Sequence, residues 1–251
     1  MQLAVDIGNT NISFGIFRDT GLLRRFDIPT KASLPNRLKR LLARIDISNS
    51  IICSVVPLAL KPLARDLAVL TGGKPYIIGK EIKVPIKNRY LKPQEVGQDR
   101  LVNAYAGIRL YRAPLIVVDF GTAVTFDVIS KDKDYLGGMI IPGLAISLEA
   151  LSERAALLPR IKLAKPKEFI GRSTKDSMLS GIVYGFACLT DNLIARIRAR
   201  IGKTAYAVGT GGNVVLVSKY CCLLDAVDKD LTLKGLNSLL ISYKKIPKKN
   251  S

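Results

Sequence analysis

One short pattern occurs twice in this sequence, as Val5-Asp6-Ile7-Gly8-Asn9-Thr10 and as Val118-Asp119-Phe120-Gly121-Thr122-Ala123. Each copy follows an apolar run, passes through an Asp and a Gly, and leads into a second β-rich run, at 12–17 and at 124–129. The copies lie 113 residues apart, which is about the size of a small domain. We therefore predict two similar domains, 1–113 and 114–251, that face each other across a central cleft.

Apolar strand patterns and amphipathic helical patterns alternate along both halves, which indicates an α/β fold. We expect strands at 2–8, 11–17, 22–28, 50–55, 76–78, 114–119, 124–129 and 205–208. We expect helices from a cap at Ser33 to 45, at 57–70, 99–111, 174–201 and 231–243, and after Asn213. The Gly- and Pro-containing stretch 137–143 reads as a turn-rich entry to a further helix that reaches Leu157.

Composition excludes several kinds of chemistry. The chain has 251 residues and no histidine, which rules out a Ser-His-Asp triad, a His-ligated zinc and a histidine general base. The four cysteines show no C-x-x-C spacing and read as reduced thiols. The sequence opens on a strand pattern instead of a signal peptide and shows no apolar run of about 18 residues. We therefore expect a cytoplasmic protein with no membrane segment.

The charge is strongly positive, +19 from 39 basic and 20 acidic residues. Such a field can attract nucleic acid or small anions. The basic residues are spread along the chain at the spacing of solvated helix faces, and tryptophan, a good stacking platform, is absent. We therefore expect small anionic ligands and no nucleic-acid partner.

The first turn, from Asp6 to Asn11, is suited to a polyphosphate. A tight turn after a strand exposes backbone N–H groups that bind phosphate oxygens, and Thr10 and Asn11 add neutral donors. Asp6 can hold Mg²⁺ next to the phosphates. An ordinary hairpin turn is the alternative, and the second copy, in which Asp119 can carry a cation and Thr122 can clamp a phosphate, argues against it.

Two common nucleotide-binding motifs are absent. Gly202-Lys203-Thr204 ends like a Walker A loop, but Ile197 stands where the leading Gly belongs. No G-x-G-x-x-G follows a strand, and Gly209-Thr210-Gly211-Gly212 is by itself only a weak signal for a nucleotide turn. P-loop and Rossmann folds are therefore disfavoured.

Gly97-Gln98-Asp99-Arg100 carries the second candidate chemistry. Asp99 stands at an expected helix start, where a plain N-cap is the alternative reading. Arg100 can hold a substrate carboxylate, and Asp99 can accept the proton of an attacking hydroxyl, as in phosphoryl transfer. We expect the Arg100 charge to lower the pKa of Asp99.

Taken in order, these motifs resemble the type III pantothenate kinases, a branch of the superfamily of acetate and sugar kinases, Hsp70 and actin. The resemblance implies two ribonuclease H-like domains of the actin and Hsp70 type. Departures are the basic surface and Asn213 after the Gly pair. The matching elements include Asp6–Thr10, Cys53–Pro57, Tyr90, Pro93, Gly97–Arg100, Asn103-Ala104, Asp119–Ala123, Thr125, Asp127, Gly137-Gly138, Pro142-Gly143, Leu158-Pro159, Gly171, Thr174, Gly181, Tyr184-Gly185, Thr210–Gly212 and Leu231–Leu236.

The resemblance also implies roles for single residues. Asp99 would be the proton acceptor, and Asp119 would bind K⁺ or NH₄⁺, in addition to the Mg²⁺ that accompanies ATP. ATP would lie on Asp6, Ile7, Gly8, Asn9, Thr10, Asn11, Ile12, Ser13 and Thr122. Pantothenate would contact Tyr90, Gly97, Gln98, Asp99, Arg100 and Thr174.

The expected activity is therefore ATP-dependent phosphorylation of pantothenate to 4′-phosphopantothenate, the first step of coenzyme A biosynthesis. The resemblance implies a homodimer, and the apolar stretch from Ile140 to Leu158 fits an isologous contact, with a buried core helix as the alternative. Two rival functions stay open: a kinase for another small hydroxy acid, and a catalytically idle regulator that binds pantothenate or nucleic acid.

Overall fold

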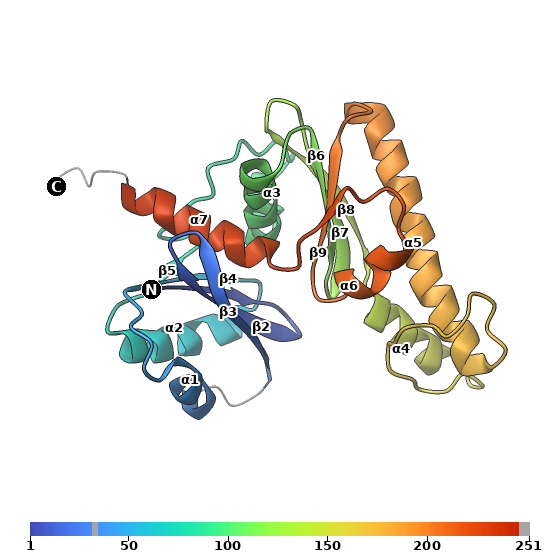
Figure 1. The fold of residues 1–251 in the computed structure, drawn as a ribbon, viewed down its shortest axis with the longest axis horizontal. Helices are drawn as coiled ribbons and strands as arrows, with labels where there is room; N and C mark the ends of the chain where they lie inside the picture. Colours follow the sequence, from blue (N-terminus) through green and yellow to red (C-terminus); the bar gives the residue numbers. More distant parts are fainter. Residues whose placement is uncertain (32–34, 246–251) are drawn as a thin grey trace. The chain divides into compact units, whose positions relative to one another are not determined.

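The structure is a computed structural model that describes residues 1–31 and 35–245 (Figure 1). The cap expected at Ser33 lies outside the described residues. The chain forms two units, each built on a five-stranded mixed sheet. The expectation of two similar α/β domains is thereby confirmed.

The first unit has the strand order β3-β2-β1-β4-β5. β1, β2 and β3 are antiparallel, whereas β4 and β5 run parallel to β1. Figure 1 shows α1 and α2 on one face of this sheet and α7 on the other. The elements are β1 (Gln2–Ile7), β2 (Asn11–Arg18), β3 (Gly21–Pro29), α1 (Pro35–Leu42), β4 (Asn49–Ser54), α2 (Pro57–Thr71), β5 (Tyr76–Ile77), η1 (Pro93–Glu95), the first part of α3 (Gln98–Leu110) and α7 (Leu231–Lys245).

Alternation along β1 decides which side chains reach the site. Leu3, Val5 and Ile7 are fully buried in the core shared with α1 and α2. Ala4 points to the opposite face, where it packs with α3 and α7. Because successive side chains of a strand point to opposite faces, Asp6 lies on the same face as Ala4.

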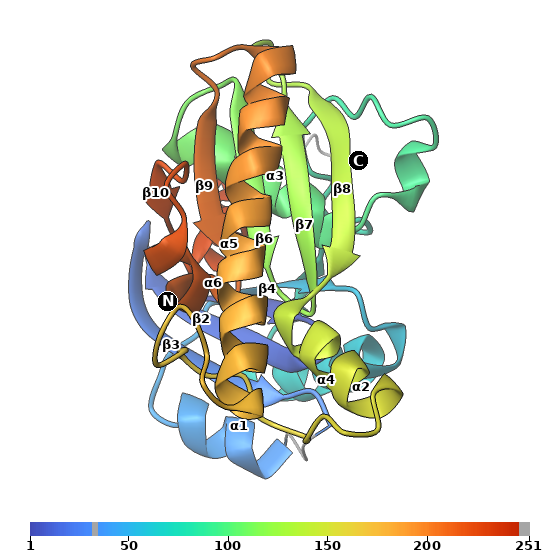
Figure 2. The same cartoon turned by 90° about the vertical axis from the view of Figure 1, so that its right-hand side faces the viewer.

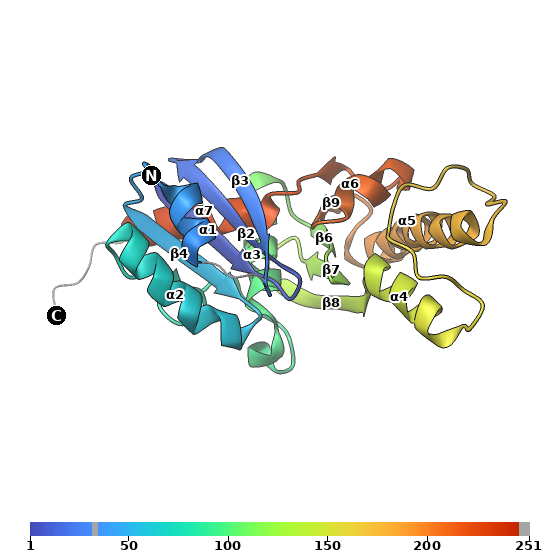
Figure 3. The same cartoon turned by 90° about the horizontal axis from the view of Figure 1, so that it is seen from below.

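The second unit repeats this plan with the order β10-β9-β6-β7-β8. β6, β7 and β8 are antiparallel, and β9 and β10 run parallel to β6. Figure 2 shows α5 lying across one face of the sheet, and Figure 3 shows α4 beside the start of α5. The elements are β6 (Leu115–Phe120), β7 (Ala123–Ile129), β8 (Tyr135–Pro142), α4 (Leu144–Arg154), α5 (Thr174–Ile201), β9 (Tyr206–Thr210), α6 (Val214–Val217), η2 (Ser218–Tyr220) and β10 (Ala226–Val227).

The bounds of the two units differ from the predicted split at 113/114. α7 belongs to the first unit because Leu233, Leu236 and Leu240 are buried in the core beneath β1. A short connecting segment instead pairs with β8 and belongs to the second unit. The first unit is Met1–Ile86, Lys92–Ala106 and Leu231–Ser251, and the second is Lys87–Leu91 and Gly107–Asp230.

Residues 137–143 were expected to form a turn, but 135–142 form strand β8. The Gly and Pro residues suggested a break, yet the free edge of β7 supplies backbone partners along the whole stretch. The helix that follows ends at Arg154 instead of Leu157, α6 has only four residues, and β10 was not predicted.

Helix α5 is long and apolar enough to cross a membrane by length and composition, although the sequence has no unbroken apolar run of about 18 residues. An 18-residue window in it has a mean hydropathy of 1.4, which makes it the one such helix in the described part of the chain. The buried side chains of Ala187, Ile194 and Ile197 face the core of the second unit, and Val183 is buried as well. Only 39% of that window is buried, so core packing accounts for part of its apolar character.

Candidate active site

The turn between β1 and β2 carries exposed polar residues, and the residues that flank it are buried in the core. The N–H of Gly8 donates to the carbonyl of Asn11 at 3.0 Å, and the hydroxyl of Thr30 donates to the carbonyl of Gly8 at 2.7 Å. Asn9, Thr10 and Asn11 are exposed, whereas the flanking Ile7 and Ile12 are fully buried. The backbone of the turn is thus held by hydrogen bonds, whereas its polar side chains are exposed to solvent.

Ser13, at the far end of this predicted phosphate segment, is already engaged. Its hydroxyl donates to Oδ1 of Asp27 at 2.7 Å, and Arg25 lies 3.3 Å from the same oxygen. A phosphate would have to compete with Asp27 for the Ser13 hydroxyl.

Asp6 and Asp99 come together around Cys53 in the first unit. Cys53 on β4 is the Cα partner of Asp6 on β1, so the two side chains share a face of the sheet. The thiol is fully buried and packs in one cluster with Val102, which lies three residues after Asp99 on α3. Burial, and then the charges of Asp6 and Asp99, raise the pKa of the Cys53 thiol well above its usual value. The phosphate turn and the candidate base therefore share one site.

Asp99 is held at the start of α3. Its Oδ1 accepts the N–H of Arg100 at 2.9 Å. A Cβ at Gly97 would collide with the same oxygen, so only glycine leaves this carboxylate in place. The Gln98 side chain packs on Gly79, 3.1 Å from the position of a Cβ there.

Burial raises the pKa of Asp99, and the N–H and charge of Arg100 only partly oppose that effect. Arg100 thus lowers the pKa of Asp99 as expected, but burial is the larger effect and makes the net shift upward. Arg100 is itself 7% exposed, so desolvation of the carboxylate outweighs the attraction.

Asp119 lies at the end of β6 in a cradle of glycines in the second unit. A Cβ at Gly211 would collide with Oδ1 of Asp119, and a Cβ at Gly121 would stand 3.3 Å from it. Gly211 has φ +93°, a conformation that favours glycine. The N–H of Asn213 donates to the carbonyl of Phe120 at 3.0 Å and ties the β9–α6 turn to β6.

Thr122 is exposed on the turn between β6 and β7. Its carbonyl accepts the N–H of Gly143 at 3.1 Å, and a Cβ at Gly143 would collide with that carbonyl. The start of α4 therefore braces the turn from below and leaves the Thr122 side chain facing solvent.

A buried carboxylate adjoins this turn. Asp127 on β7 is fully buried, and its Oδ1 accepts the Tyr135 hydroxyl at 2.8 Å. Its Oδ2 accepts the Thr125 hydroxyl at 3.4 Å. Sequence reasoning noted Thr125 and Asp127 only as motif positions, and Tyr135 was missed, because nothing in the spacing joins a residue on β8 to Asp127.

Tyr90 belongs to the second unit. The N–H of Arg89 donates to the carbonyl of Tyr135 at 2.8 Å, and Arg89 Nε lies 2.7 Å from Asp134 Oδ2. The Tyr90 ring lies 3.5 Å from the Cβ position of Gly137. The pairing with β8 thus fixes Tyr90 against the strand.

Thr174 is the exposed first residue of α5. The Ser173 hydroxyl caps the helix by accepting the N–H of Asp176 at 3.1 Å, and Leu148 on α4 packs against Met178 and Leu179. The predicted substrate residues therefore divide between the units: Gly97, Gln98, Asp99 and Arg100 lie in the first, and Tyr90 and Thr174 in the second.

The carboxylates that could bind a cation stand singly and not in clusters. No group of three Asp, Glu or Cys residues gathers among residues 1–31 and 35–245. Mg²⁺ is commonly bound by one or two carboxylates together with substrate phosphates and water, so Asp6 fits an ion that arrives with a nucleotide.

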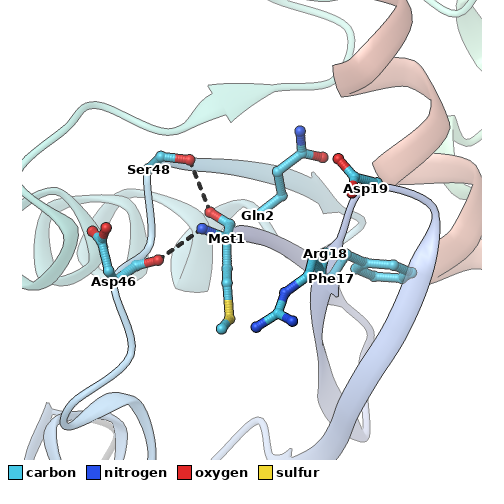
Figure 4. A pocket seen from close by; sticks show the side chains of 7 residues that line it. All are labelled: Met1, Gln2, Phe17, Arg18, Asp19, Asp46 and Ser48. Carbon is cyan, nitrogen blue, oxygen red and sulfur yellow. Dashed lines mark hydrogen bonds between the residues drawn. The ribbon is translucent and has the colours of Figure 1, made fainter.

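A cavity of about 330 Å³ lies at the other end of β1 (Figure 4). The amino group of Met1 donates there to the carbonyl of Asp46 at 2.8 Å, and the Ser48 hydroxyl donates to the carbonyl of Met1 at 3.0 Å. Asp6 stands near the opposite end of the strand, and none of the predicted site residues lines this cavity.

Comparison with known proteins gives the family. A model of the family described as "Type III pantothenate kinase" matches residues 2–196. A protein of that name from Geotalea uraniireducens is 40% identical over 249 residues, 95% of this chain and 97% of its own. Another, from Halalkalibacterium halodurans, is 40% identical over 255 residues, 98% of this chain and 99% of its own.

Among solved structures, a conserved putative Baf family transcriptional activator from Campylobacter jejuni aligns with a TM-score of 0.62. It is 21% identical and covers 97% of this chain and 100% of its own, which shows a shared fold. The full-length identity to the two curated relatives and the family match together show that this chain belongs to the type III pantothenate kinase family.

Proposed function

We propose that this chain transfers the γ-phosphoryl group of ATP to the primary hydroxyl of pantothenate, giving 4′-phosphopantothenate, the first step of coenzyme A biosynthesis. One observation carries the proposal beyond family membership. Asp6 and the half-buried Asp99 meet around Cys53 on one face of the first sheet. A phosphate cradle beside a desolvated carboxylate is what phosphoryl transfer to a hydroxyl requires.

ATP is proposed to lie with its phosphates on the turn from Asp6 to Ser13, with Thr122 as a second hydroxyl donor. The exposed side chains of Asn9, Thr10 and Asn11 support this placement. Asp6 would hold the Mg²⁺ that neutralises the phosphates when ATP is bound.

Asp99 is proposed as the proton acceptor. Its raised pKa brings the carboxylate closer to the working pH, and proton transfer is most efficient there. The transition state of phosphoryl transfer is loose, so Asp99 has to orient the hydroxyl first and take the proton late. The Gly97 contact and the Arg100 N–H fix the carboxylate for that role.

Pantothenate is proposed to bind through its carboxylate to Arg100, with Gly97 and Gln98 beside it and contacts to Tyr90 and Thr174. The guanidinium can form paired hydrogen bonds with a carboxylate.

A monovalent cation, K⁺ or NH₄⁺, is proposed at Asp119. Gly121 and Gly211 allow the backbone to approach its carboxylate closely, and Thr125 and Thr210 are its neighbours on the two adjacent strands. Oxygen ligands of this kind suit a hard cation.

A homodimer in the cytoplasm is proposed as the working form. Exposed apolar side chains gather on β8, α4 and the segment that follows: Ile140 is 62% exposed and Leu157 is 94% exposed. Phe169 and Ile170, just before α5, are also exposed apolar residues. Isolated exposed apolar residues are common, but a contiguous set marks an interface.

A coupled ADP-release assay tests the proposal. With pantothenate and K⁺ we expect ADP release that depends on pantothenate, and much weaker release when Na⁺ replaces K⁺. Release with another hydroxy acid but not with pantothenate would favour the first rival. Absence of turnover together with duplex DNA binding at physiological salt would favour the regulator, a rival to which the basic charge of +19 lends some weight.

A further inference from the structure

We propose that the Thr125 hydroxyl oxygen is a further ligand of the monovalent cation beside Asp119, and that Asp127 is the residue that positions it. This inference deepens the proposed function, because it rests on the cation site at Asp119. It assigns a role to the buried carboxylate that the phosphoryl-transfer chemistry leaves unused.

The sheet register places Thr125 next to Asp119. The two residues are Cα partners on the antiparallel strands β6 and β7. Directly opposite residues of a sheet point to the same face and lie close together. Val117, two residues before Asp119, is the partner of Asp127, so Asp119, Thr125 and Asp127 all lie on one face.

The direction of the hydrogen bonds decides what Thr125 can bind. Asp127 is fully buried, and its Oδ2 accepts the Thr125 hydroxyl at 3.4 Å. A hydroxyl has one proton and two lone pairs, so a Thr125 proton directed at Asp127 leaves its oxygen as an acceptor. An acceptor oxygen suits K⁺ or the N–H of NH₄⁺ and does not suit a phosphate oxygen.

Tyr135 binds the same carboxylate through its other oxygen. Its hydroxyl donates to the other oxygen, Oδ1 of Asp127, at 2.8 Å, and the Tyr135 side chain is fully buried. The direction of the Thr125 proton therefore depends on Oδ2 of Asp127 and not on the bond from Tyr135. The Tyr135→Phe variant therefore offers a matched control, because it removes a hydrogen bond to Asp127 and leaves the Thr125 contact in place.

The test measures cation binding without turnover. The full chain, with a non-hydrolysable ATP analogue and no pantothenate, is titrated with KCl against choline chloride at constant ionic strength. The K⁺-dependent rise of the unfolding midpoint gives a half-saturating K⁺ concentration for each variant.

Thr125→Val should raise the half-saturating concentration about tenfold, which corresponds to about 1.4 kcal/mol. Thr125→Ser keeps the hydroxyl and should restore a value near that of the wild type. Asp127→Asn should raise it too, because the amide NH₂ donates to Thr125 and turns its proton toward the cation. Tyr135→Phe should lower the midpoint in choline and leave the half-saturating concentration unchanged.

Wild-type-like K⁺ dependence in folded Thr125→Val would overturn the inference, as would an equal rise in Tyr135→Phe. If K⁺ does not shift the wild-type midpoint at all, the cation site is absent and the inference falls with it. Pantothenate-dependent ADP release then shows separately whether the kinase function survives.

Discussion

Asp99→Asn separates the chemistry of the site from its architecture. The amide keeps the size of the carboxylate. Its Oδ1 can still accept the N–H of Arg100, which lies 2.9 Å from Oδ1 of Asp99 in the wild type. The fit against Gly97 is also kept. What the variant loses is the ability to take a proton from the substrate hydroxyl.

The expected loss follows from the role of a positioned base. General bases contribute roughly 10²- to 10⁴-fold to the rate. The loose transition state of phosphoryl transfer puts this case at the low end. We expect kcat to fall about 10²-fold, or about 2.7 kcal/mol in the barrier. ATP affinity should hold, because Asp99 lies outside the Asp6 turn.

The same substitution should not destabilise the protein at neutral pH. The pKa of Asp99 is raised in the folded state by burial, so folding favours the protonated form. The stabilisation from this group is complete below the pKa of the unfolded chain and is lost as pH rises through the folded pKa. Above the folded pKa the ionised carboxylate therefore costs stability, and the neutral amide removes that cost.

Two measurements check this prediction. Initial rates of pantothenate-dependent ADP release give kcat, and thermal unfolding between pH 4 and 8 gives the stability of both proteins. Asp46→Asn, an exposed carboxylate of the same unit, is the control and should change neither quantity. Near-normal kcat in Asp99→Asn would refute the base assignment, and a lower unfolding midpoint at pH 7 would refute the desolvation argument.

Three further predictions rest on single contacts. Gly97→Ala pushes a Cβ against Asp99 Oδ1, so kcat should fall at least tenfold with little change in unfolding midpoint; unchanged kcat would contradict the positioning role. Gly211→Ala meets Asp119 at φ +93° and should cost about 1–2 kcal/mol or more in stability and weaken K⁺ activation, measured by unfolding and by KCl titration of the rate; a neutral result would mean that the cradle relaxes. Ile140→Glu should shift the mass measured by light scattering toward a monomer, whereas Lys131→Glu, an exposed charge of the same unit, should not; a dimeric Ile140→Glu would exclude β8 from the interface.

Local patterns predicted much of the fold. The alternation of residues 2–7 and 11–18 and the Gly-Asn-Thr turn between them define a hairpin whatever surrounds it, and α5 begins and ends at Thr174 and Ile201 as expected. The strand at residues 135–142 could not be predicted from its own sequence, because it forms only by pairing with the edge of β7. The placement of α7 was missed for a similar reason, since its partner β1 lies at the other end of the chain.

The site was predictable to the extent that it is built from turns. The Asp-x-Gly repeat pointed to Asp6 and Asp119, but the environment of each carboxylate depends on packing. Arg100 beside Asp99 suggested a lowered pKa, and only the burial around Cys53 and α3 reverses the direction. The hydrogen bond from Tyr135 to Asp127 joins two strands and leaves no trace in either segment.

Identification of the product tests the central claim most directly. The full chain is incubated with ATP, Mg²⁺, K⁺ and pantothenate, and the organic product is analysed by mass spectrometry and ³¹P NMR. We predict one new phosphomonoester on the primary hydroxyl of pantothenate, formed by the wild type and greatly reduced in Asp99→Asn. Unmodified pantothenate after complete incubation, with a folded chain and intact ATP, would contradict the account.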